Sequence, residues 1–138
     1  MKKAIQSIVV LGLLIGMFGI TSFASNDNIG FNFKILANGL PSHSSGSRYR
    51  QTTHCDNQWK VQMTISGEGE GTVTIFSLGR VDTDKSVSPE VFATQGLGPY
   101  YQSAYPAANQ TNVNLRGKNN NYNAKTYQVY GIWDEETW

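Results

Sequence analysis

The chain has 138 residues, with 11 lysines and arginines against 10 aspartates and glutamates, and 39% of its residues are hydrophobic. Its single cysteine excludes an internal disulfide, so the fold must rest on a noncovalent core, which a chain of this length can bury. The near-neutral charge lacks the clustered basic patch that nucleic acid or anionic lipid requires. We therefore expect no nucleic-acid partner.

The N-terminus has the three parts of a secretory signal. Met1-Lys2-Lys3 is positively charged, residues 8–20 are uncharged and strongly apolar, and Ser22-Phe23-Ala24 supplies small residues for cleavage. The apolar run is shorter than the roughly 20 residues that span a bilayer, which favours a signal peptide over residues 1–24 rather than an anchor. We expect a secreted, extracellular protein, free or associated with the cell wall, whose mature chain does not insert stably into a membrane.

Residues 25–138 are predicted to form a single domain of β-strands. Apolar and polar residues alternate over 31–35 and, more clearly, over 59–66, as in strands that cover a core on one face. The glycine- and glutamate-rich stretch 67–71 then interrupts the pattern before another β-branched run begins. This arrangement predicts a β-hairpin over residues 58–80.

The second half of the chain continues in the same way. Residues 87–94 predict a weaker strand that Pro89 places at a sheet edge, and residues 112–117 alternate again. Residues 100–108 are compatible with a short strand, a loop or a helical turn. The long aromatic and β-branched run 122–133 predicts an interior strand that is paired along both of its edges.

Strands at intervals of 10 to 15 residues, without an amphipathic helix, indicate an all-β fold. We expect an antiparallel β-sandwich of six to eight strands, with a small β-barrel as the alternative. Trp133 is expected in the core. The following acids, Asp134-Glu135-Glu136, are expected to end the last strand and to keep its edge from pairing with another molecule, rather than to chelate a cation.

The residues that could support catalysis or metal binding are few. In His54-Cys55-Asp56, adjacent residues of an extended segment point to opposite sides and cannot act as a catalytic pair. A dyad of Cys55 with His43 would expose a free thiol to oxidation outside the cell. Asp82-Thr83-Asp84 lacks the rest of a calcium loop and fits a solvated turn. We therefore assign no catalytic residue, no metal and no cofactor, and we interpret Cys55 as inert rather than as the site of an intermolecular disulfide.

Aromatic residues are concentrated near the C-terminus and carry the only binding hypothesis. Flat rings beside amide side chains suit sugars, and Tyr and Trp are also favoured at protein interfaces. The simpler alternative is that most of these rings fill the core. Four residues are the candidate ligand contacts: Tyr100, Tyr101, Tyr105 and Trp138.

Several segments resemble a family of small exported proteins of unknown function from Gram-positive bacteria: Asn26-Asp27-Asn28, residues 47–52, Trp59-Lys60-Val61 and, most distinctively, residues 131–137. The resemblance implies a secreted, stand-alone domain, and it brings no catalytic residues. The arrangement of a signal peptide before a short cysteine-poor β domain is also similar to lactococcin 972-type bacteriocins, although no motif is shared.

Three functions remain open from the sequence. The first is a non-enzymatic binding or interaction module at the cell envelope, whose partner is an envelope carbohydrate or a surface protein. The second is a bacteriocin-like antagonist, or an accessory protein of a bacteriocin system. The third and weakest is an extracellular hydrolase, which would require a cleft that brings Cys55, a histidine and an acid together.

Overall fold

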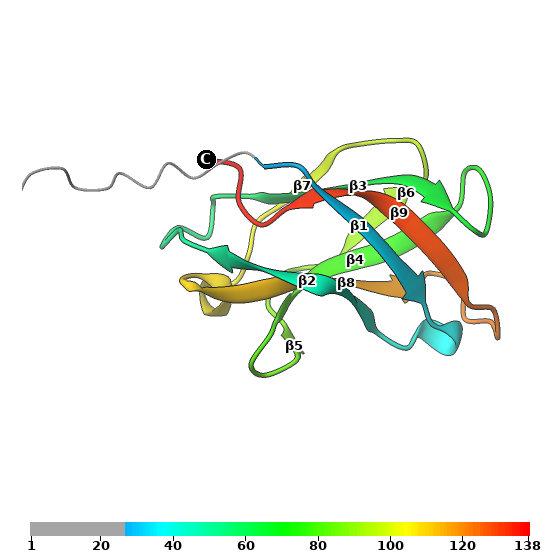
Figure 1. Ribbon diagram of the computed structural model, residues 1–138, viewed down its shortest axis with the longest axis horizontal. Helices are drawn as coiled ribbons and strands as arrows, with labels where there is room; N and C mark the ends of the chain where they lie inside the picture. The colour runs from blue at the N-terminus through cyan, green and yellow to red at the C-terminus, as the bar shows by residue number, and fades with distance from the viewer. Residues whose placement is uncertain (1–26) are drawn as a thin grey trace, which may run out of the picture.

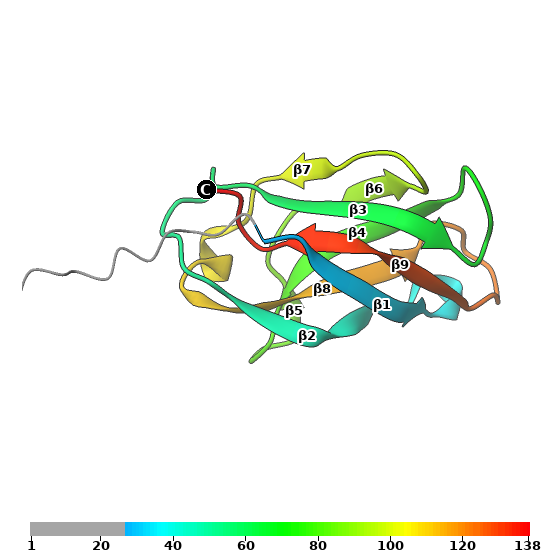
Figure 2. The ribbon, with the colours of Figure 1, turned by 45° about the horizontal axis from the view of Figure 1, so that its top comes forward.

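The computed structural model describes residues 27–138, so the predicted signal peptide over 1–24 lies outside the described residues. Two antiparallel sheets pack face to face (Figures 1 and 2). The first has the order β1 (Ile29–Ile35), β9 (Tyr127–Asp134), β3 (Trp59–Ser66) and β7 (Tyr100–Gln102). The second has the order β2 (Ser42–Arg50), β8 (Thr111–Asn119), β4 (Val73–Arg80) and β5 (Lys85–Ser86), and β6 (Val91–Thr94) also pairs with β4.

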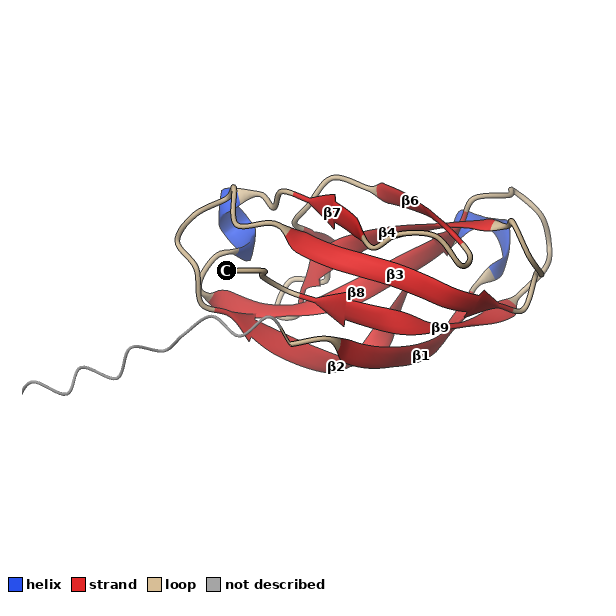
Figure 3. Cartoon of the chain, turned by 90° about the horizontal axis from the view of Figure 1, so that it is seen from above, coloured by secondary structure: helices blue, strands red, loops and turns tan. Residues whose placement is uncertain are grey.

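The predicted antiparallel sandwich is confirmed, and the sheets do not close into a barrel. Nine strands are found within residues 27–138, which exceeds the expected six to eight, and β5 has only two residues. Two short 3-10 helices, η1 (Ala37–Gly39) and η2 (Pro106–Ala108), lie at opposite ends of the sandwich (Figure 3). None of the helices in the described part of the chain is both long and apolar enough to cross a membrane.

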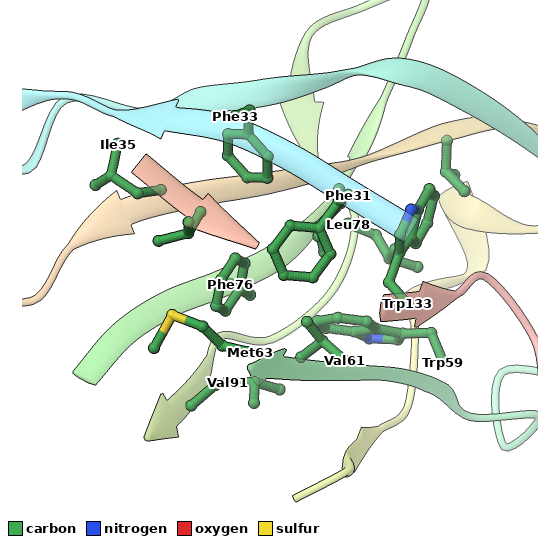
Figure 4. Close-up of a cluster of buried hydrophobic side chains, with 14 of the residues drawn as sticks. Phe31, Phe33, Ile35, Trp59, Val61, Met63, Phe76, Leu78, Val91 and Trp133 are labelled. Atoms are coloured by element: carbon green, nitrogen blue, oxygen red, sulfur yellow. The ribbon is translucent and has the colours of Figure 1, made fainter. Parts of the chain in front are cut away.

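The core lies between the sheets and follows the alternation of the strands. Trp59, Val61 and Met63 of β3 point inward and are fully buried, while the residues between them face away from the core. The rings of Phe31, Phe33 and Phe76 pack with centroids 5.5 to 6.4 Å apart, in the tilted and edge-on arrangements that aromatic rings favour (Figure 4).

The interior position of the last strand and the burial of Trp133 are confirmed, although the strand begins only at Tyr127, so residues 122–126 of the predicted run precede it. β9 pairs with β1 along one edge and with β3 along the other, so it is interior to its sheet. Trp133 is 2% exposed and lies in the core close to the indole of Trp59 (Figure 4).

The predicted hairpin over residues 58–80 is wrong, because β3 and β4 belong to different sheets. β3 pairs with β9 and β7, whereas β4 pairs with β8, β5 and β6. The stretch 67–71 therefore crosses from one sheet to the other, and Gly69 and Gly71 adopt positive φ there. The alternation of apolar and polar residues indicates which face of a strand is buried, but it does not indicate which other strands pair with its edges.

Two other segments also differ in detail from the sequence pattern. β2 was not predicted, because its serines, glycine and charged residues do not alternate with apolar ones, and its pairing with β8 shifts register between His43 and Ser47. Of the predicted strand 87–94, only β6 is extended, and it pairs with β4 alone, which agrees with an edge position. Residues 100–108 contain both β7 and η2.

Candidate functional site

The acidic segment after β9 is buried, which corrects the expectation that it would protect a sheet edge. Asp134, Glu135 and Glu136 are 0%, 4% and 2% exposed. β9 does end at Asp134, but it is not an edge strand. The three acids instead turn toward the end of β2, where cationic side chains and backbone N–H groups are available.

Arg50 is the centre of this buried region and is fully enclosed. Its guanidinium donates hydrogen bonds to the backbone carbonyls of Glu135, Asn57 and His54, and its Nε donates to Asn109 Oδ1 at 3.3 Å. Burial lowers the pKa of Arg50, and nearby carboxylates oppose that effect. Since the planar guanidinium presents five donors in a fixed geometry, it can join three segments of backbone at one point.

The two glutamates bind the segment that contains Arg50. Glu136 accepts hydrogen bonds from the backbone N–H groups of Gln51 and Thr52 at 3.2 and 2.9 Å. Glu135 accepts one from Arg48 Nε at 3.1 Å, and this bond raises the pKa of Arg48. These hydrogen bonds join the end of β9 in the first sheet to the end of β2 in the second.

Asn57 holds the last residues of the chain. Its Oδ1 accepts the backbone N–H groups of Thr137 at 2.9 Å and Trp138 at 3.3 Å, and its Nδ2 donates to the carbonyl of Trp138. Thr137 also donates its hydroxyl to the carbonyl of Gln58. We call the network of Arg48, Arg50, Asn57, Glu135 and Glu136 the C-terminal clasp.

Asp134 lies beside the clasp, and among residues 27–138 its carboxylate has fewer hydrogen-bond partners than that of Glu136. Its Oδ1 accepts the N–H of Glu136, but its Oδ2 has no hydrogen-bond partner among the residues that the structure describes. Burial raises the pKa of Asp134 to about 6, Glu135 adds to the increase, and the charges of Lys60 and Arg48 oppose it. The ionised carboxylate is therefore an unfavourable group in this fold.

The four predicted ligand contacts fall into two groups. Tyr100 is partly buried against the core, and its hydroxyl accepts the N–H of Thr94 at 3.3 Å. Tyr101, Tyr105 and Trp138 are 50%, 47% and 58% exposed. Tyr100 thus faces inward, while the other three rings are available at the surface.

The three exposed rings are brought to one end of the molecule by residues 54–60. Tyr101 lies opposite Lys60 across the β7–β3 pair, and the residue before Tyr105 donates its N–H to the carbonyl of Cys55. Trp138 lies against His54, with ring centroids 5.9 Å apart. Figure 3 shows η2, which directly follows Tyr105, at the end of the sandwich where the chain finishes. We call Tyr101, Tyr105 and Trp138 the aromatic end.

The histidine and thiol groups are not assembled into one site. Cys55 is a partly buried free thiol whose Sγ accepts a hydrogen bond from Asn109 Nδ2 at 3.6 Å. His43 lies at the start of β2, at the opposite end of that strand from Arg50. Within residues 27–138, no group of three or more His, Cys, Asp or Glu side chains is placed to hold a metal ion. Asp82 and Asp84 are exposed, and each forms an ion pair with an arginine.

The clasp residues were not predicted from the sequence, although one signal was present. Two of the segments that carry the family resemblance, 47–52 and 131–137, are the two sides of the clasp. They are 79 or more positions apart in the chain, and no spacing rule connects them. Only the fold reveals that residues of these two segments belong to one buried network.

Fold and clasp together define a small all-β sandwich domain whose C-terminal segment is secured by buried polar contacts. The chain belongs to the family described as Protein of unknown function (DUF2712), which matches residues 20–137. Comparison with curated proteins and with solved structures gave no match. The expected membership in a family without an assigned function is confirmed, while export, Gram-positive origin and the likeness to bacteriocins stay predictions.

Proposed function

We propose that this protein is a secreted, non-enzymatic binding module that contacts a carbohydrate or a surface protein of the cell envelope through its aromatic end. The observation that carries the proposal is the position of Tyr101, Tyr105 and Trp138, three large rings left about half exposed at one end of a well-buried sandwich. Tyrosine and tryptophan offer a flat apolar surface together with a polar atom, which suits both kinds of partner.

The clasp supports this role because it restrains the backbone that carries Trp138. Asn57 makes three hydrogen bonds to Thr137 and Trp138, and the ring itself lies against His54. A side chain that is already held in place loses less conformational freedom when a ligand binds, so more of the contact energy is retained as affinity.

One exposed amide side chain, that of Gln58, lies at the same end of the molecule as the rings. Gln58 is exposed next to the clasp, whereas Gln102 of β7 is paired with the inward-facing Trp59 and so lies on the face opposite Tyr101. The Gln58 amide can donate to and accept from the hydroxyl groups of a sugar or the backbone of a protein. The rings and this amide together provide the chemistry that the proposed partners require.

The test is retention of the purified protein by envelope fractions of the producing cell. We expect the protein to be retained, and Tyr101→Ala, Tyr105→Ala or Trp138→Ala to weaken retention, with at least one variant losing about tenfold. Phe92→Ala is the matched control, since Phe92 is 55% exposed on the other sheet.

The proposal is overturned if the unaltered protein is not retained, or if all three variants bind as it does. Inhibition of neighbouring strains by the purified protein, without retention on the producer's own envelope, would support the antagonist instead.

A further inference from the structure

A concave site lies at the end of the sandwich opposite the aromatic end. It is an open pocket of about 420 Å³, which is within the range of roughly 300 to 1,000 Å³ typical of small-molecule sites. Its lining residues come from the loop that follows β3 and from the loop that precedes β9, together with the start of β9. Figure 1 shows both loops at the same end of the sandwich. Its lining is mainly polar: Gly67, Glu68, Thr72, Asn121, Asn123, Lys125, Thr126 and Tyr127.

Glu68 is the group in this pocket that lacks a partner. Its Oε2 is shielded from solvent and has no hydrogen-bond partner among residues 27–138. The backbone is held in place, because the N–H of Glu68 donates to Ser66 Oγ at 3.3 Å and the N–H of Gly67 donates to the carbonyl of Gln128 at 2.8 Å. A carboxylate with too few hydrogen-bond donors around it is stabilised by a ligand that supplies donors. The carboxylate can also rotate about its last side-chain bond, which exchanges the positions of its two oxygens.

The opposite wall is a preorganised loop of amide side chains. Asn123 Oδ1 accepts hydrogen bonds from Asn119 Nδ2 at 3.0 Å and from the N–H of Lys125 at 3.1 Å. Asn119 Oδ1 accepts the N–H of Asn121 at 2.8 Å. The side-chain amide of Asn121 makes no hydrogen bond to the described part of the chain, which leaves both a donor and an acceptor available.

An aromatic ring closes the inner side of the pocket. Tyr127 is 6% exposed, and its hydroxyl shares a hydrogen bond of 2.9 Å with Thr74 Oγ1. Burial raises the pKa of the Tyr127 hydroxyl, and the negative charge of Glu68 adds to the increase. The tyrosine is thus a fixed, neutral wall beside the carboxylate.

From this arrangement we infer that the pocket is a binding site for a neutral, hydroxyl-rich ring, the pyranose of a saccharide. Sugar hydroxyls both donate and accept, so they can donate to Glu68 while they accept from the Asn121 amide and from Lys125. The single acid and the single lysine in the lining balance in charge, which favours a neutral ligand. Glu68 would repel a phosphate, and one carboxylate beside a lysine is a poor cage for calcium, which takes six to eight oxygens.

The pocket is separate from the aromatic end, so an experiment can refute one of the two proposed binding sites without refuting the other. The test is titration of the isotopically labelled protein with methyl glucoside and with N-acetylglucosamine, followed by amide NMR shifts. We expect saturable shifts at Gly67, Thr72 and Lys125 with at least one of the two sugars.

Glu68→Gln should weaken this binding about tenfold or more, since a hydrogen bond to a charged group is replaced by one to a neutral group. Its matched control is Glu70→Gln, because Glu70 is an exposed acid of the same loop that does not line the pocket. Asn121→Ala, in an exposed loop, is a second variant expected to weaken binding. Tyr101→Ala should leave it unchanged.

The inference is overturned if neither sugar shifts these amides, if the shifts map to the aromatic end, or if Glu68→Gln and Asn121→Ala both bind like the unaltered protein. Equal shifts with calcium chloride in place of sugar would also overturn it, because they would identify a cation site.

Discussion

Arg50 has an unusual position for an arginine, because it is fully buried and its hydrogen bonds go mainly to carbonyl groups rather than to a carboxylate. A buried charge is costly unless its donors are satisfied, and here they are satisfied by carbonyls of two backbone segments, the loop 54–58 and the segment after β9, and by the Asn109 side chain. A lysine could not do the same, since an ammonium lacks the planar arrangement of donors. The side chain therefore determines how the end of β2, the loop 54–58 and the segment after β9 come together.

Loss of Arg50 should destabilise the protein strongly. Arg50→Ala leaves several buried carbonyls without donors and is expected to lower the free energy of unfolding by about 3 to 5 kcal/mol, with Arg50→Lys losing about 2 kcal/mol. Urea denaturation measures both values. Arg80→Ala is the control, because its ion pair with Asp82 is exposed, and it should shift the midpoint far less. Equal shifts for Arg50→Ala and Arg80→Ala would contradict the role of the clasp.

Asp134 should make the stability of the protein depend on pH. Its pKa is raised to about 6 in the folded state from an ordinary value near 3.8, so the folded state binds the proton more tightly. Stability from this group is therefore present below about pH 4 and is lost as the pH rises toward 6 and above.

Asp134→Asn keeps an acceptor for the N–H of Glu136 and removes the buried charge. We expect it to stabilise the protein by roughly 1 to 2 kcal/mol at pH 7, with a gain that shrinks as the pH falls from about 6 to about 4. Denaturation of both proteins across this range measures the difference. A gain that does not vary with pH would show that the carboxylate is not the cause.

At the scale of the strands, the alternation of apolar and polar residues predicted strand positions best where one face of the strand is buried and the other is not. β3 alternates cleanly from Trp59 onward, and β9 is interior to its sheet, with Val129 facing the core and Tyr130 40% exposed on the other face. β2 could not be recognised in this way, since its polar residues flank an irregular pairing rather than a continuous apolar face. The false hairpin has a similar origin: the glycines of 67–71 permit a turn, but they equally permit a crossing between sheets.

The close approach of β9 and β3 should make Gly131 intolerant of a side chain. A Cβ at Gly131 would overlap the carbonyl oxygen of Gln62 and would approach the ring of Phe31 to 2.7 Å. We expect Gly131→Ala to cost about 2 to 3 kcal/mol of stability, because backbone must move to accommodate it. Gly30→Ala, on neighbouring β1 with no atom within 4 Å, should be neutral or slightly stabilising. Thermal unfolding of the two variants compares them directly, and similar melting temperatures would refute the prediction.

For the whole molecule, the strands of each sheet are joined by backbone hydrogen bonds, whereas the two sheets meet through side chains and through isolated backbone bonds such as that from Gly96, after β6, to Met63 of β3. The apolar core supplies most of that contact, and at one end the clasp joins β9 of the first sheet to β2 of the second. The candidate site could be predicted only in part for this reason. Aromatic residues such as Trp138 are visible in the sequence, whereas hydrogen-bond partners such as Asn57 and Thr137 are 80 positions apart and meet only in the fold.

Opening the clasp should therefore loosen one end of the molecule while the rest stays folded. Asn57→Ala removes three hydrogen bonds to Thr137 and Trp138 and leaves the strand ladders intact. Hydrogen exchange should accelerate at the amides of Thr137 and Trp138, and to a lesser degree at Gln51 and Thr52, while exchange in the β4–β8 ladder changes little. Asn112→Ala, an exposed position on β8, is the matched control and should leave these amides unchanged. If exchange in Asn57→Ala rises equally throughout the sandwich, the clasp is part of the global folding unit; if it does not rise at Thr137 and Trp138, the clasp does not hold the tail.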